Sequence, residues 1–381
     1  MRDILKQNNV ALRHEIEQLR RILLDARDQI PEELQNYEVK IANTCSDLQQ
    51  QVLQNLEDLD FEQDNPLKDI LSNTQLVTRA FHFLNKQQVS PILRARTSDR
   101  LCLKLLLWLH ATHPKTKNIP VAFRDEEFSI WPIEPTIYFM PCAAQQGLLY
   151  LPLFFHEFGH LLYACHRLEM NDLVRELQAE IGDLLLPAVQ RNDEYTQEQE
   201  ANRNVIVETW YEWAQEIFCD AVGFVIGGPS FAYAFSMYMQ MLGRSQYHVP
   251  KEELIRRPHP VTWIRIQLIT ERTRREGYNA VASVLEATWS AIAEAMRIIE
   301  DYDGFYDPTF FPVIQQKIDD MLTEAAPREF KESEVSITET ESPLTSPIAL
   351  LNLAWQRFWE DSEGYRVWEE NAIATFLDSE I

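Results

Sequence analysis

The sequence His156-Glu157-Phe158-Gly159-His160, set in the apolar stretch from Leu148 to Tyr163, constrains the fold of this chain more than any other feature. The surrounding Leu and Phe residues, with a proline at position 152 that suits a first helical turn, predict a buried helix over about 154–167. Residues four apart lie on one face of a helix, so His156 and His160 can point at one ion. Because unpaired buried polar groups are costly, these side chains need a function.

An HExxH sequence on a helix is typical of a zinc site in which both histidines bind the metal. Glu157 is turned about 100° from His156 around the helix, which keeps it off the metal but near a metal-bound water, where it can act as general base. Gly159 costs roughly 1 kcal/mol relative to alanine inside a helix, so we expect a neighbouring strand to approach closely there. The pattern also arises by chance, so alone it does not establish a metal site.

A catalytic zinc ion usually takes three protein ligands and leaves a fourth position for water, so a third ligand is expected downstream. The next long predicted helix carries Glu208, Glu212 and Glu216. Only Glu216 is followed one turn later by an aspartate, Asp220, which places both carboxylates on one face. We therefore expect Glu216 to bind the metal and Asp220 to accept the free ring N–H of His156. Glu212 is the alternative ligand.

Two later sequence elements carry a family resemblance. HEFGH followed by Glu216-Ile-Phe-Cys-Asp220 resembles the gluzincin branch of HExxH metallopeptidases, whose pattern is HExxH and then ExxxD. The stretch His259-Pro-Val-Thr-Trp-Ile-Arg265-Ile resembles the HPxxxxRI element of CAAX prenyl proteases and related peptidases. This resemblance covers about residues 120–275 and implies a zincin-like domain that hydrolyses peptide bonds. It also implies that His259 stabilises the oxyanion and that Arg265 pairs with a carboxylate. From the residues alone, His259 between two prolines is equally consistent with the start of a helix.

Hydrophobic periodicity predicts an N-terminal helical unit over residues 1–115. Within it, the apolar positions of 12–23 and 37–59 predict two helices packed as a hairpin, and further helices are expected at about 66–85 and 98–112. The zincin-like domain is expected over 116–325. Its short β-prone runs at 120–123 and 136–139 predict a small sheet. Helices are predicted at about 170–190, 200–226, 230–243, 260–275, 279–300 and 308–324.

Residues 326–347 are rich in Pro, Ser, Thr and Glu, which favours a linker or mobile loop. Residues 348–381 return to a core-like composition and are expected to form a C-terminal helical segment that docks on the body. The predicted fold class is therefore α+β, mainly α.

Composition limits the partners and the compartment. With 35 basic and 59 acidic side chains, the net charge of −24 repels phosphate backbones, so no nucleic acid partner is expected. No apolar run approaches the ~20 residues needed to span a bilayer, and no secretory signal is visible. Five cysteines without a CxxC pair indicate a reducing compartment. We expect a soluble, cytoplasmic protein without membrane insertion.

The predicted function is zinc-dependent hydrolysis of a peptide or protein substrate with one catalytic Zn²⁺ ion. Two alternatives stay open. The same residues could hydrolyse another amide or an ester, or the chain could be a catalytically silent scaffold whose N-terminal helices bind a protein partner. Cys165 and His166 are a weaker candidate for a second metal site.

Overall fold

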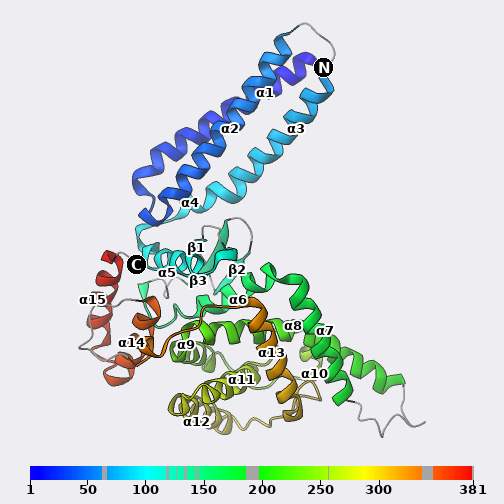
Figure 1. Cartoon of the computed structure of the whole chain (residues 1–381), viewed down its shortest axis with the longest axis vertical. Helices are drawn as coiled ribbons and strands as arrows, with labels where there is room; N and C mark the ends of the chain where they lie inside the picture. Colours follow the sequence, from blue (N-terminus) through cyan, green and yellow to red (C-terminus); the bar gives the residue numbers. More distant parts are fainter. Residues whose placement is uncertain are drawn as a thin grey trace. The chain divides into compact units, whose positions relative to one another are not determined.

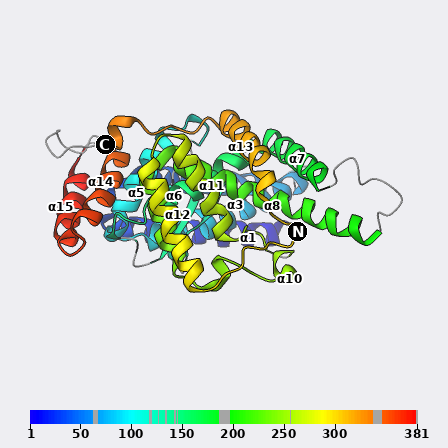
Figure 2. The ribbon, with the colours of Figure 1, turned by 90° about the horizontal axis from the view of Figure 1, so that it is seen from below.

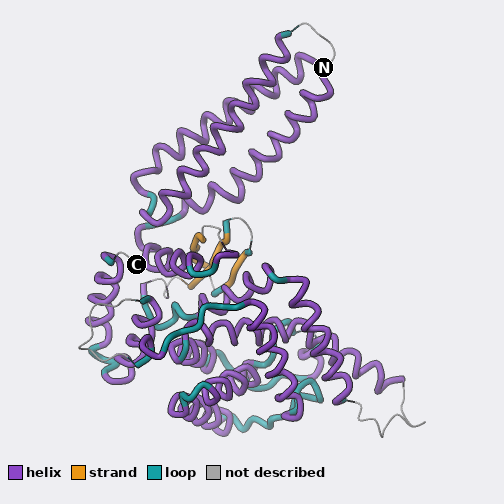
Figure 3. The backbone as a smooth tube through the Cα atoms, viewed as in Figure 1, coloured by secondary structure: helices purple, strands orange, loops and turns teal. Residues whose placement is uncertain are grey.

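The computed structural model is mainly helical, with 78% of residues in helices and one small sheet. Figure 3 shows the three strands grouped in one place, with helices making up nearly all of the rest. The structure describes residues 1–61, 67–116, 120–125, 127–132, 135–141, 144, 146–185, 197–255, 257–336 and 346–379. The expected helix-rich mixture with a small sheet is confirmed at this level.

By its internal contacts the chain divides into two compact units. The first comprises Met1–His110, Asn118–Glu127 and Trp131–Gln146, and the second comprises Ala111–Lys117, Phe128–Ile130 and Gly147–Ile381.

The first unit begins with three long helices that run side by side (Figure 1): α1 (Arg2–Ala26), α2 (Gln35–Asp60) and α3 (Leu67–Phe83). The apolar positions that repeat every three or four residues on α1 are the buried ones, so the predicted hairpin of α1 and α2 is confirmed. Its third partner, α3, was predicted as a helix but not as a member of the bundle. A buried polar layer joins the three helices through Asn9, Asn55 and Thr74, whose side chains hydrogen-bond to one another.

After α3 the chain passes through a π-helical segment (Leu84–Val89), α4 (Ser90–Arg94) and α5 (Arg100–Ala111) to the sheet. The strands are β1 (Pro120–Asp125), β2 (Ser129–Trp131) and β3 (Thr136–Pro141), in the order β1-β3-β2. β1 pairs with β3 in parallel, with Pro120 opposite Thr136 and Asp125 opposite Pro141. Both predicted β runs are confirmed as strands, whereas β2 was not predicted.

The second unit is built around α8 (Gln197–Gly227). Among the described residues, six helices pack directly against it: α6 (Leu153–Cys165), α7 (Arg167–Leu184), α9 (Pro229–Gln240), α11 (Thr262–Arg275), α13 (Phe311–Ala325) and α14 (Pro347–Glu360). The later half of α8 is apolar on most sides, with Trp210, Trp213 and Phe224 fully buried, which suits a central helix. Gly228 ends it in a left-handed conformation (φ +60°) that favours glycine, and Pro229 then starts α9.

The remaining helices complete the second unit. The one-turn helix α10 (Lys251–Leu254) was not predicted, and α12 (Asn279–Ala295) packs on α11. From below, Figure 2 shows α11 and α12 side by side, and α14 (Pro347–Glu360) beside α15 (Tyr365–Asp378). Among the described residues, no helix is long and apolar enough to cross a membrane.

The C-terminal helices are bonded to the rest of the second unit. Asn352 of α14 donates to the Gly227 carbonyl and accepts the Ser230 backbone N–H, so one buried side chain bridges the end of α8 and the start of α9. Glu369 of α15 accepts the backbone N–H of Leu148 at 2.6 Å. Of the expected linker at 326–347, residues 337–345 lie outside the described residues.

Candidate metal centre

The helix that carries the HExxH sequence is pressed against α8. α6 begins after Pro152 and is buried along almost its whole length. A Cβ atom built on Gly159 would lie 2.7 Å from the Cα atom of Cys219, which is closer than atoms can pack. The expected reason for this glycine, a close backbone approach, is therefore correct, but the neighbour is helix α8 and not a strand.

The contacts between α6 and α8 run in antiparallel order. His156 faces Asp220, Gly159 faces Cys219, and His160 faces Glu216. One turn of α6 is thus matched by one turn of α8, so the HExxH and ExxxD spacings bring their side chains to the same place. Both spacings follow from the i, i+4 geometry of a helix.

His156, His160 and Glu216 form a three-donor group. One ligand atom from each lies within 4.8 Å of the other two. Among the described residues, no other group of three His, Cys, Asp or Glu side chains comes together this closely. His156 Nε2 lies 3.4 Å from Glu216 Oε2, and His160 Nε2 lies 3.6 Å from Glu216 Oε1. The alternative ligand Glu212, one turn earlier on α8, is exposed.

The donors present fit a cation. Glu216 Oε2 is buried and makes no hydrogen bond within the described part of the chain. A buried acceptor without a partner is unfavourable, and a cation between Glu216 and the two imidazoles would satisfy it. Two imidazoles and one carboxylate are a donor set that zinc prefers.

Asp220 and Arg265 support the three-donor group through hydrogen bonds. His156 Nδ1 lies 2.9 Å from Asp220 Oδ1, which fixes the ring and leaves Nε2 toward Glu216. Arg265 donates from Nε and Nη2 to both oxygens of Asp220, each at 2.7 Å. Its Nη2 also lies 3.5 Å from Glu216 Oε2, and its guanidinium lies over the ring of Phe235. Asp220 therefore lies against His156, and Arg265 against two carboxylates, as the sequence suggested.

His259 and Glu157 are the other two side chains that the sequence assigned to the site. The side chain of His259 is 54% exposed, and its Nε2 is 3.5 Å from Glu216 Oε1. Glu157 is buried on α6 next to His156. All seven side chains singled out in the sequence thus belong to the second unit and to helices α6, α8 and α11 or the turn before α11.

The charges of these neighbouring side chains shift one another's pKa values. Burial alone would raise the pKa of Glu216, but the contact with the His156 ring at 3.4 Å and the charge of Arg265 hold it well below its usual range. Burial would lower the pKa of His156, but Asp220 and Glu216 raise it to about 10. Burial and the charge of His156 lower the pKa of His160 to about 4. A metal ion bound to both rings would replace the proton that His156 holds in its absence.

One residue that positions this site was not predicted. Trp213, three residues before Glu216 on α8, donates its indole N–H to the carbonyl oxygen of Arg257 at 3.1 Å. This bond ties the turn that carries His259 to the helix that carries Glu216. A buried tryptophan needs a partner for its N–H, which was the available signal, but the sequence does not tell which distant carbonyl supplies it.

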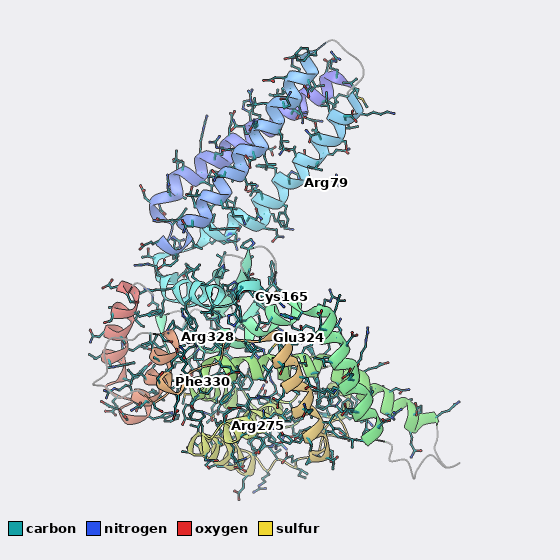
Figure 4. All side chains as sticks on the ribbon, in the orientation of Figure 1. Arg79, Cys165, Arg275, Glu324, Arg328 and Phe330 are labelled. Carbon is teal, nitrogen blue, oxygen red and sulfur yellow. The ribbon has the colours of Figure 1, made fainter. Side chains whose placement is uncertain are left out.

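The weaker second metal candidate is not assembled. His166 is buried between Lys115, whose Nζ lies 3.0 Å from Nε2, and Glu324, whose Oε1 lies 3.0 Å from Nδ1. Figure 4 labels Cys165 and Glu324 near each other in the second unit. Among the described residues, these side chains do not meet the spacing of a three-donor metal group, and the ammonium of Lys115 fills the position that a cation would need.

Comparisons with known proteins identify no relative of this chain. No family model, curated protein or solved structure matches this chain.

Proposed function

We propose that the chain is a zinc-dependent metallopeptidase with a zincin-like catalytic domain of the gluzincin type. One observation carries the proposal: the donors of His156, His160 and Glu216 converge within 4.8 Å, although Glu216 lies far along the chain from the two histidines. The buried, unbonded Oε2 of Glu216 supports a cation at this point. Such an arrangement is expected when the residues share one ion and not when they match a motif by chance.

His156, His160 and Glu216 would hold the zinc ion. A zinc ion bound in this way supplies a Lewis acid that polarises a carbonyl and lowers the pKa of water. Asp220 holds His156 with Nε2 directed toward Glu216, and Arg265 holds Asp220 through two hydrogen bonds. The protein thereby fixes the donor directions before any ligand binds.

Glu157 is the general base of the proposed reaction. Its place next to His156 leaves its carboxylate turned about 100° from the donor face. From there it accepts a proton from the attacking water and returns it to the leaving amine. His259, which is half-exposed beside Glu216, is placed to donate a hydrogen bond to the oxygen on which negative charge develops.

The test is hydrolysis of a diverse peptide library by the wild-type protein and by Glu157→Gln. The wild type should generate new amino termini, and the variant should keep its metal but lose the activity. The same assay with amide and ester substrates separates peptide hydrolysis from the alternative reactions. A Glu157→Gln variant with full proteolytic rate would refute the mechanism.

A further inference from the structure

Arg257 is a partly buried cation beside the site that forms no ion pair with the described residues. It lies in the turn between α10 and His259 and is half-buried. Within the described part of the chain, its side chain makes no hydrogen bond or ion pair, and its backbone carbonyl is the group that Trp213 binds. Burying a charge without a partner is unfavourable, so the position calls for an explanation.

The arginines of the neighbouring helix α11 are paired. Arg265 binds Asp220, and both Arg272 and Arg275 bind Asp319; Figure 4 labels Arg275. The chain has 59 acidic and only 35 basic side chains, so carboxylates are not scarce. Burial lowers the pKa of Arg257, Glu253 opposes that shift, and the like charge of Arg265 adds to it. Glu253 acts on the charge of Arg257 without forming an ion pair with it, so the guanidinium can still bind a further anion.

The backbone places Arg257 close to the proposed metal centre. Trp213 holds its carbonyl against α8, three residues before Glu216. Two residues after Arg257, His259 Nε2 is 3.5 Å from Glu216 Oε1. Two residues of chain span at most about 7 Å. The Arg257 backbone therefore lies beside the proposed metal centre, and its guanidinium is close enough to Arg265 for the two charges to interact.

We propose that Arg257 recognises a carboxylate of the peptide substrate next to the scissile bond, an inference that rests on the proposed peptidase function. A guanidinium binds a carboxylate through two parallel hydrogen bonds, and the contact is stronger where water is partly excluded. The net charge of −24 repels acidic peptides at long range, so a local cation is needed to admit them. The carboxylate comes either from the C-terminus of the peptide or from an Asp or Glu side chain.

The experiment measures binding and not turnover. The zinc-loaded Glu157→Gln protein is titrated into fluorescent hexapeptides of one sequence, monitored by anisotropy. One peptide has a free C-terminal carboxylate, one has a C-terminal amide, and further amidated peptides carry Glu in place of Gln at single positions. We expect one of the carboxylate forms to bind about tenfold more tightly than its neutral counterpart. Which form it is identifies the source of the carboxylate.

Three second-site variants complete the test. Arg257→Gln should abolish the preference, Arg257→Lys should keep part of it, and Arg21→Gln, which removes the same charge from helix α1, should keep it all. Equal affinity for charged and neutral peptides, including no measurable binding of either, overturns the proposal, as does a preference that survives Arg257→Gln. Hydrolysis by the wild type is scored separately. A preference without hydrolysis refutes the peptidase function alone, and hydrolysis without a preference refutes the role of Arg257 alone.

Discussion

Gly159 of α6 lies so close to Cys219 of α8 that the two helices leave no room for a side chain at position 159. This contact sets the distance between the helix that carries His156 and His160 and the helix that carries Glu216. The geometry of the proposed metal site thus depends on a residue that binds nothing.

Gly159→Ala tests that dependence. A Cβ atom 2.7 Å from the Cys219 Cα must push α6 and α8 apart. Overpacking of this kind costs about 1–3 kcal/mol, which outweighs the roughly 1 kcal/mol that alanine gains in helix propensity. We expect lower stability in urea and weaker zinc binding. Gly182→Ala is the control, because its Cβ would crowd the tip of the Arg203 side chain at 2.9 Å and meet Val207 at an ordinary contact distance of 3.4 Å. Unchanged zinc affinity in Gly159→Ala would contradict the account.

Asp220→Asn tests the support of His156. The variant keeps the size of the side chain but removes the charge that pairs with Arg265. Loss of such a supporting carboxylate weakens metal binding by about 10- to 100-fold. Breaking the buried pair leaves Arg265 with only its 3.5 Å contact to Glu216 and should cost about 3–5 kcal/mol of stability. Zinc affinity is measured by competition with a chelator, and stability by urea unfolding. Adding Arg265→Met should restore part of the stability but not the zinc affinity; wild-type affinity in Asp220→Asn would contradict the role of Asp220.

Trp213→Phe tests the positioning of His259. The variant keeps an aromatic ring in the core but loses the hydrogen bond to the Arg257 carbonyl. We expect kcat to fall about tenfold to a hundredfold, because small misplacements of a reacting group are costly, while zinc content stays unchanged.

Trp210→Phe is the matched control for this variant. Trp210 is equally buried, but it donates to the Phe305 carbonyl and not to a carbonyl of the turn that carries His259. Both variants should lose about 1 kcal/mol of stability, but Trp210→Phe should keep its kcat. Equal losses of kcat in the two variants would show that Trp213 acts on stability alone.

The hydrogen bonds of Asp319 with Arg272 and Arg275 lead us to expect that the stability of the protein depends on pH. Burial would raise its pKa, but its hydrogen bonds with Arg275 and Arg272 hold the pKa below the usual value. Because the folded pKa is lower than the unfolded pKa of about 3.9, the stabilisation is fully present above the unfolded value and is lost as pH falls through the folded one. Asp319→Asn should therefore be less stable by about 1–3 kcal/mol at pH 7 and should lose less stability between pH 5 and 3. Urea unfolding across pH checks this; parallel curves for the two proteins would contradict it.

Sequence periodicity predicted most helices of the fold, because the apolar positions of a helix such as α1 repeat every three or four residues and are the ones that become buried. It also predicted both halves of the candidate site, because a spacing of four residues puts His156 with His160, and Glu216 with Asp220, on one face. Which helix lies against Gly159 could not be predicted, since that depends on packing between distant segments. The partner of Trp213 is a backbone carbonyl, and carbonyls look alike in every sequence. Strand β2 and the one-turn helix α10 are too short to show a period.

The most direct test of the metal centre is the zinc content of the purified protein, measured by elemental analysis beside a His156→Ala variant of confirmed fold. The account predicts about one zinc ion per wild-type chain and little or none in the variant. A wild-type protein that takes up no zinc when the metal is supplied, or a His156→Ala variant that retains as much as the wild type, would contradict it.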